Sequence, residues 1–106
     1  WVLGGVGEAG YTNATWRSDD GGSTWNKVLS KPKWSPRTRL GVAAGSTYPD
    51  PSPKAVIYVV GGQGPAGLRG DVWASDTLCR TWHRMAEEAP FGARADVMCA
   101  TVPGNP

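Results

Sequence analysis

The sequence repeats itself at a distance of 57 residues, without gaps, and this repeat limits how the chain can fold more than any other feature. Residues 2–10, "VLGGVGEAG", fall on residues 59–67, "VVGGQGPAG". Trp16 falls on Trp73 and Trp25 on Trp82. Tryptophans that match at two fixed places, together with a Gly-Gly pair, predict two copies of one structural unit packed side by side.

Each unit contains segments that are typical of strands. Residues 39–44, "RLGVAA", and 55–62, "AVIYVVGG", are continuous and apolar, as expected of buried strands. Residues 71–75 and 81–85 alternate apolar and polar side chains and are separated by a short turn. The 15 glycines and 9 prolines predict frequent reversals. Since no segment shows a sustained helical period, we expect an all-β fold of four-stranded units.

The order of these features resembles two families of β-propeller. "IYVVGG" followed by "DVW", a later "TW" and an arginine before the next first strand is similar to a kelch repeat. "SDDGGSTW", residues 18–25, matches the Asp-box pattern S-x-D-x-G-x-T-W through Ser18, Asp20, Gly22, Thr24 and Trp25. The resemblance covers essentially the whole chain and implies propeller blades of four antiparallel strands.

The resemblance also implies a division of the chain within one propeller domain. Residues 1–36 would hold strands two to four of one blade and its connector, 37–93 a complete blade and its connector, and 94–106 the first strand of the next blade. These are about two blade-equivalents, which cannot close a ring, and a propeller has roughly six to eight blades. We therefore expect a fragment of a longer propeller, with the assembly of several short chains as the alternative.

The Asp box is expected to fold a turn rather than to bind a ligand. Gly21 and Gly22 can take positive φ angles, and Asp20 can accept hydrogen bonds from turn amides. We expect the Trp25 ring to be buried beneath the turn, with its indole N–H bonded to a carbonyl. Ca²⁺ needs more oxygens than Asp19 and Asp20 supply, so no metal site is expected.

The second copy of the box, "SDTLCRTW", is altered. It keeps Ser75, Thr81 and Trp82 but has Thr77, Leu78 and Cys79 in place of the aspartate and the two glycines. A ligand site would lose its charge through these changes, whereas a hairpin could survive with a different turn geometry. The comparison favours a structural role for both copies.

Two arginines stand at equivalent positions before first strands. In kelch-like blades such residues, here Arg37 and Arg94, lie near one face of the ring and could meet an anionic ligand. The alternative is that they bond neighbouring carbonyls or stack on Trp34 and Phe91.

Three segments are expected to be long loops that carry specificity: "GVGEAGYTNAT", "GQGPAGLRG" and "GSTYPDPSPK". The contact residues expected in them are Glu8, Tyr11, Tyr48 and Arg69.

The remaining motifs are less informative. We interpret the Gly-Gly pairs as strand-end turns, because no helix or Lys-Ser/Thr follows them. Cys79 and Cys99 show no metal-ligand spacing and are either buried thiols or a disulfide. Asn13 begins an N-glycosylation sequon, which together with the Asp boxes favours a secreted or cell-surface location. No cofactor is expected. Glu87 and Glu88 lie in a connector, where a paired-carboxylate site is the alternative to solvated side chains.

These observations restrict the function. The net charge of +2 is spread along the chain and does not predict nucleic-acid binding, and no apolar stretch is long enough to insert into a membrane. We expect a non-catalytic interaction module that binds a protein or glycan through its face loops. The alternatives are a fragment of a sialidase-like glycoside hydrolase, which would require clustered acids and arginines, and a structural subunit of an extracellular assembly.

Overall fold

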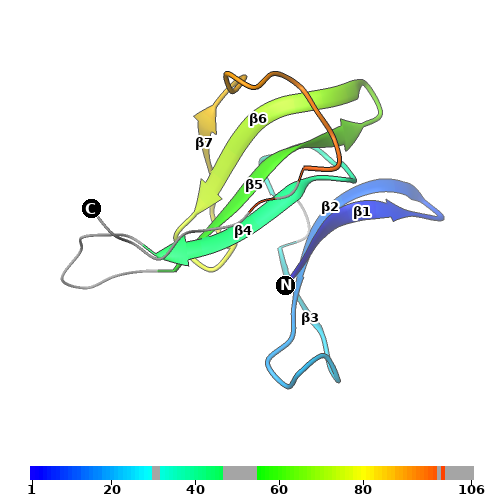
Figure 1. Cartoon of the computed structure of the whole chain (residues 1–106). Coiled ribbons are helices and arrows are strands. Elements are labelled where there is room, and N and C mark those ends of the chain that lie inside the picture. Colours follow the sequence, from blue (N-terminus) through cyan, green and yellow to red (C-terminus); the bar gives the residue numbers. More distant parts are fainter. Residues whose placement is uncertain (30–31, 47–54, 98, 100–106) are drawn as a thin grey trace.

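The computed structural model describes residues 1–29, 32–46, 55–97 and 99, and in these residues all regular structure is β (Figure 1). The first sheet has the order β1 (Val2–Gly7), β2 (Gly10–Arg17) and β3 (Asn26–Leu29). The second sheet has the order β4 (Gly41–Ser46), β5 (Ala55–Gly64), β6 (Gly67–Ser75) and β7 (His83–Ala86). Neighbouring strands are antiparallel throughout. The prediction of an all-β chain is confirmed.

Strand β5 lies between two neighbours and is the most buried strand of the second sheet. Only its first residue, Ala55, is exposed, while Ile57 and Val59 are almost fully buried. A strand flanked on both sides and covered on one face by the first sheet favours a continuous β-branched sequence over alternation, because few of its side chains reach water. This is the segment whose unbroken apolar run predicted a buried strand.

Elements of the two sheets correspond at the distance of the sequence repeat. Strand β3 begins at Asn26 and β7 at His83, 57 residues later. The N–H of Gly5 donates to the carbonyl of Arg37 at 2.7 Å, and the N–H of Gly62 donates to the carbonyl of Arg94 at 2.8 Å. Equivalent amides therefore bond equivalent carbonyls in both halves of the chain.

The Gly-Gly pairs do not end their strands, contrary to the expectation from the sequence. Gly4 and Gly61 lie inside β1 and β5, where each strand shifts register against its partner as in a β-bulge. Their φ angles are +68° and +60°, and a Cβ on either would lie 2.7 Å from the carbonyl oxygen of an arginine in the following connector. Glycine is required at both positions because a side chain would meet backbone atoms that cannot move away.

Two of the three expected long loops are hairpins. Strands β1 and β2 run to within two residues of each other, with Glu8 and Ala9 in the turn, and β5 and β6 leave only Pro65 and Ala66 between them. The third segment, which contains Tyr48, lies almost entirely outside the described residues. Both hairpins extend toward the same side of the molecule (Figure 1).

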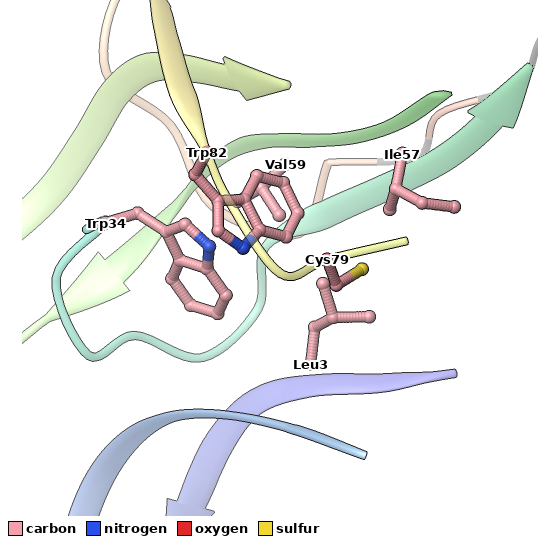
Figure 2. Packing of buried hydrophobic residues seen from close by; sticks show 6 residues of the cluster. All are labelled: Leu3, Trp34, Ile57, Val59, Cys79 and Trp82. Atoms are coloured by element: carbon pink, nitrogen blue, oxygen red, sulfur yellow. The ribbon is translucent and has the colours of Figure 1, made fainter. Parts of the chain in front are cut away.

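The core lies between the two sheets (Figure 2). Leu3 comes from the first sheet and Trp34 from the connector after it, and they meet side chains of the second sheet. The buried cluster consists of Leu3, Trp34, Ile57, Val59, Cys79 and Trp82, with Val28, Leu40 and Trp73 packed against it. Because both sheets contribute, their contact buries apolar surface that each would expose alone.

Candidate functional site

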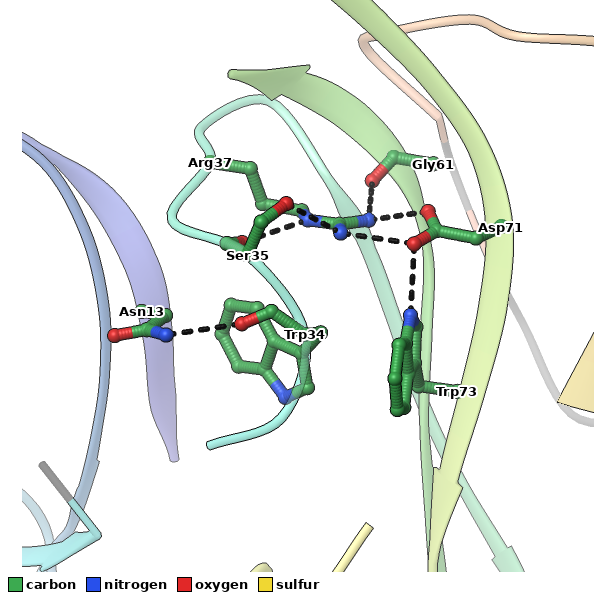
Figure 3. Close-up of polar contacts among 7 residues, drawn as sticks. All are labelled: Asn13, Trp34, Ser35, Arg37, Gly61, Asp71 and Trp73. Atoms are coloured by element: carbon green, nitrogen blue, oxygen red, sulfur yellow. Dashed lines mark hydrogen bonds and ion pairs between the residues drawn. The ribbon is translucent and has the colours of Figure 1, made fainter. Parts of the chain in front are cut away.

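Arg37 anchors a buried polar network in the connector between the sheets (Figure 3). Its side chain is 1% exposed and forms a two-pronged ion pair with Asp71 of β6, at 2.5 Å to Oδ1 and 2.9 Å to Oδ2. The guanidinium also donates to the Gly61 carbonyl and to the carbonyl and hydroxyl of Ser35. A planar fork with fixed donors suits such a two-pronged contact, which a lysine could not reproduce.

Asp71 is held ionised by this network. Burial of the carboxyl raises its pKa, but hydrogen bonds from Arg37 and from the indole N–H of Trp73, with the charge of Arg37, lower the pKa more. The net direction is a pKa below the ordinary value. Asp71 is therefore a carboxylate that holds Arg37 in place. Both of its oxygens accept hydrogen bonds from side chains of this chain, namely Arg37 and Trp73.

The structure places the two repeated arginines differently. Arg37 is buried, so it cannot reach a ligand at the surface, and its guanidinium lies 5.8 Å from the centre of the Trp34 ring. Arg94 is exposed, lies 5.4 Å from the Phe91 ring and donates to the Phe91 carbonyl. These are the contacts of the alternative interpretation, in which the arginines bond carbonyls and stack on rings.

The first Asp box closes on itself through Asp20. Its Oδ1 accepts hydrogen bonds from the N–H groups of Ser23 and Thr24, and its Oδ2 accepts one from the Thr24 hydroxyl. The hydroxyl of Ser18 accepts from the N–H of Gly22 at 2.8 Å. The donors around Asp20 lower its pKa from the ordinary 3.8 to about 2, the Thr24 hydroxyl contributing most. A carboxylate with this many local donors completes the turn and has little capacity left for a metal.

The second box keeps the same geometry without the aspartate. Thr77 Oγ1 accepts from the N–H of Thr81 at 2.8 Å and lies 2.7 Å from its hydroxyl, as Asp20 does with Thr24. Ser75 Oγ accepts from the N–H of Cys79 at 2.9 Å. Leu78 and Cys79 have φ angles of +55° and +67°, in the same left-handed region as Gly21 and Gly22. The expectation of a different turn geometry is not met, because a threonine hydroxyl replaces most of the carboxylate's bonds.

The two box tryptophans differ in burial. Trp25 donates its indole N–H to the Gly22 carbonyl, as expected, but its ring is 42% exposed rather than buried beneath the turn. Trp82 is 1% exposed and meets Trp34, with 5.9 Å between ring centres and an interplanar angle of 84°. The ring of Trp82 is covered by the first sheet, whereas no sheet of the described chain covers Trp25.

A polar cleft of about 580 Å³ lies beside β6, β7 and the connector after β7. Two arginines and three acids line it, with smaller residues between them: Leu68, Arg69, Gly70, Asp71, Arg84, Glu87, Glu88 and Ala93. The Nε of Arg69 is buried and has no hydrogen-bond partner among the described residues. The cleft therefore brings together charges of both signs, although Asp71 is already paired with Arg37.

The hairpin ends form a second exposed feature, which we call the tip surface and define by Val6, Glu8, Tyr11, Arg39 and Leu68. Val6 is 62% exposed and Leu68 is 54% exposed. Between the hairpins, the Arg37 N–H donates to the Thr12 carbonyl, and Thr38 and Gln63 exchange two backbone hydrogen bonds at 2.8 Å. Through residues 37 and 38, these bonds tie both hairpins to the same connector, and the tip surface exposes apolar and charged side chains on and beside these hairpins.

Arg39 completes the tip surface through contacts with the second half of the chain. It forms an ion pair with Asp96 and donates to Oε1 of Gln63 at 2.7 Å. Hydrogen bonding from Arg39 lowers the pKa of Asp96. Arg39 and Asp96 are themselves 57 residues apart and both have positive φ angles, +58° and +57°. No local motif marks either residue as functional, and their equivalent positions under the 57-residue repeat are the signal in the sequence that points to them.

The other predicted residues are dispersed. The side-chain amide of Asn13, which begins the sequon, donates to the carbonyls of Pro32 and Trp34. A glycan attached to its nitrogen would leave one N–H, so at most one of these bonds could remain. Cys79 and Cys99 are free thiols, and burial raises the pKa of Cys79 to about 11. Burial also raises the pKa of Cys99. Glycosylation of Asn13 remains a prediction.

Known proteins do not extend this description. Comparisons with models of protein families, with curated proteins and with solved structures find no match to this chain. In the part of the chain that the structure describes, no three His, Cys, Asp or Glu side chains are grouped to hold a metal ion. The same residues contain no helix long and apolar enough to cross a membrane.

Proposed function

We propose that the two sheets are blades of a kelch-like β-propeller with Asp-box turns, and that the chain is a non-catalytic module that binds a protein or glycan. The tip surface carries this proposal. It exposes Val6 on the first hairpin and Leu68 on the second, with Glu8 in the first turn and Arg39 bonded to Gln63 of the second hairpin. Exposed apolar side chains that occur together with charged ones are typical of binding surfaces.

The propeller interpretation is supported by the equivalence of the two halves. In the second sheet, four antiparallel strands follow one another in chain order, as in a propeller blade. The first sheet has the counterparts of three of these strands and the same bulge and turn positions. Successive units with one internal geometry, joined through apolar faces, are what a propeller requires. A secreted or cell-surface location stays a prediction.

The polar cleft favours one alternative, a sialidase-like glycoside hydrolase. Such an enzyme needs acids and arginines gathered at one place, and the cleft contains Glu87, Glu88, Arg69 and Arg84. The glutamates would supply the acid and base or nucleophile, and the arginines would bind an anionic sugar. The pairing of Asp71 with Arg37 leaves fewer free acids, which weighs toward binding without catalysis.

A binding screen tests the first proposal. The chain is applied to an array of immobilised glycans and to an array of extracellular protein domains, and each hit is measured again with Val6→Asp, Leu68→Asp and Lys33→Ala. We expect at least one hit that both tip variants abolish. Lys33 is exposed outside the tip surface, so its variant should bind normally. A lack of hits, or hits insensitive to both tip variants, would contradict the proposal.

A turnover assay distinguishes the enzyme. Chromogenic glycosides, including sialosides, are incubated with the chain and with Glu87→Gln and Glu88→Gln. Binding without catalysis predicts no release of chromophore from any substrate. Release that a single Gln variant abolishes, with an unchanged unfolding midpoint, would establish the hydrolase instead.

A further inference from the structure

The contact between the two sheets involves two different surfaces, one from each sheet. The first sheet contributes one of its two faces, which we call its rear; Leu3 and Val28 lie there, together with Trp34 of the following connector. The second sheet contributes the opposite face, which we call its front; Val59 and Trp82 lie there and are almost fully buried against the rear of the first sheet. In Figure 2, Leu3 and Trp34 face Cys79, Val59 and Trp82 across this contact. The contact is therefore head to tail, not symmetric.

The front of the first sheet repeats the front of the second sheet, but no other sheet in the described part of the chain covers it. Under the 57-residue repeat, Val2 corresponds to Val59 and Trp25 corresponds to Trp82. The side chain of Val2 is 49% exposed. The side chains around them also match. Lys27 lies 5.1 Å from the Trp16 ring, and 57 residues later Arg84 lies 5.8 Å from the Trp73 ring. We call this the front surface and define it by Val2, Trp16 and Trp25.

The rear of the second sheet likewise repeats the covered rear of the first. Met85 corresponds to Val28 and is 64% exposed, and Phe91 corresponds to Trp34 and is 41% exposed. A shallow, largely apolar groove of about 220 Å³ lies beside Met85, lined by Val56, Tyr58, Ala74, Asp76, His83 and Met85. We call this the rear surface and define it by Tyr58, Met85 and Phe91.

We propose that the front surface of one chain docks on the rear surface of a second copy, repeating the contact already made inside the chain. The internal contact shows which partner each surface fits: Trp25 would meet Phe91 as Trp82 meets Trp34, and Val2 would approach Met85. This docking would bury the exposed side chains of Trp25 and Met85. Because the two surfaces differ, each added copy leaves one of each free, and assembly continues into a ring or a filament.

Charge insertions at matched exposed positions test the docking. Val2→Arg alters only the front surface, Met85→Arg only the rear surface, and Leu68→Arg is the control on the tip surface; all three residues are about half exposed or more. Circular dichroism and urea unfolding establish that each variant is folded. Sedimentation velocity then gives the size of the species over a wide range of concentration.

The native chain and Leu68→Arg should associate beyond dimers as concentration rises, whereas each surface variant alone should stay monomeric. A mixture of Val2→Arg and Met85→Arg should form a one-to-one dimer and nothing larger, since one intact front and one intact rear remain. A native chain that stays monomeric at every concentration overturns the proposal. Association of either surface variant alone, or no dimer in the mixture, overturns it as well.

Discussion

Trp34 and Trp82 meet edge to face, and this contact joins the two sheets, which share no strand. Both rings are almost fully buried, although their counterparts under the repeat, Phe91 and Trp25, are 41% and 42% exposed. Burial at these positions therefore depends on whether another sheet is adjacent, and not on the place of the residue in its own unit.

Replacing each box tryptophan should separate these environments. Trp82→Ala is expected to lower the free energy of unfolding by about 3–5 kcal/mol, as for buried tryptophans generally. Trp25→Ala loses a partly exposed ring and one hydrogen bond, and we expect about 0.5–1.5 kcal/mol. Urea unfolding followed by circular dichroism measures both, with the milder Trp82→Phe if the alanine variant does not fold. Equal losses at the two positions would refute the packing described.

Arg37 and Arg94 provide a matched test of the buried ion pair. Arg37→Met leaves the Asp71 carboxylate buried without its main partner, and we expect a loss of about 3 kcal/mol. Arg94→Met changes an exposed side chain and should alter stability by about 0.5 kcal/mol or less. Unfolding free energies at neutral pH give the comparison. If the two variants are equally stable, the Arg37 network does not stabilise the fold.

Asp20 should make stability depend on pH in acid. Its pKa in the folded chain is about 2, below the ordinary 3.8, so the folded state favours the ionised form. The stabilisation is therefore complete above about pH 4 and is lost as the pH falls toward 2. Asp20→Thr keeps an acceptor, as Thr77 does in the second box, but does not titrate. Thermal midpoints from pH 5 to about 2 should fall more steeply for the native chain than for Asp20→Thr; parallel curves would contradict the assignment.

Leu78 occupies a backbone conformation that suits glycine. A left-handed residue with a side chain costs about 1–2 kcal/mol, and Leu78 is exposed enough to lose little packing when shortened. We expect Leu78→Gly to raise stability by up to about 1 kcal/mol and Gly21→Ala, at the equivalent position, to lower it by about 1 kcal/mol. No atom would contact a Cβ at Gly21, so its effect comes from the backbone alone. A loss of stability in Leu78→Gly would show that the turn is not strained.

The strands were predictable because their signal is local. The β-branched run of β5 and the positions of both Asp boxes follow from residues adjacent in sequence, and the self-bonding of Asp20 follows from the chemistry of a short turn. The Gly-Gly bulges were misassigned because glycine marks a turn and a close backbone approach equally well. The carbonyls that distinguish them, Arg37 for Gly4 and Arg94 for Gly61, lie far along the chain.

The candidate site was less accessible to sequence reasoning. Its pairings join residues far apart in the chain, such as Arg37 with Asp71 and Arg39 with Asp96. The residues around Arg37 and Arg39 in the sequence do not predict which aspartate each arginine pairs with, since an arginine has the same donors whether it is buried or exposed. The exposure of Trp25 also differs from the expectation of a ring buried beneath its own turn, because the turn alone does not cover the ring and burial at this position requires a neighbouring sheet, as at Trp82.

The central claim is that residues 57 positions apart occupy equivalent places in two units of one fold. Scalar couplings across hydrogen bonds, measured by NMR on the isotopically labelled chain, test it at the atoms concerned. The account predicts one coupling from the Gly5 amide nitrogen to the Arg37 carbonyl carbon and another from Gly62 to Arg94. If either amide couples instead to a carbonyl that breaks this correspondence, the two halves are not equivalent units and the propeller proposal loses its support.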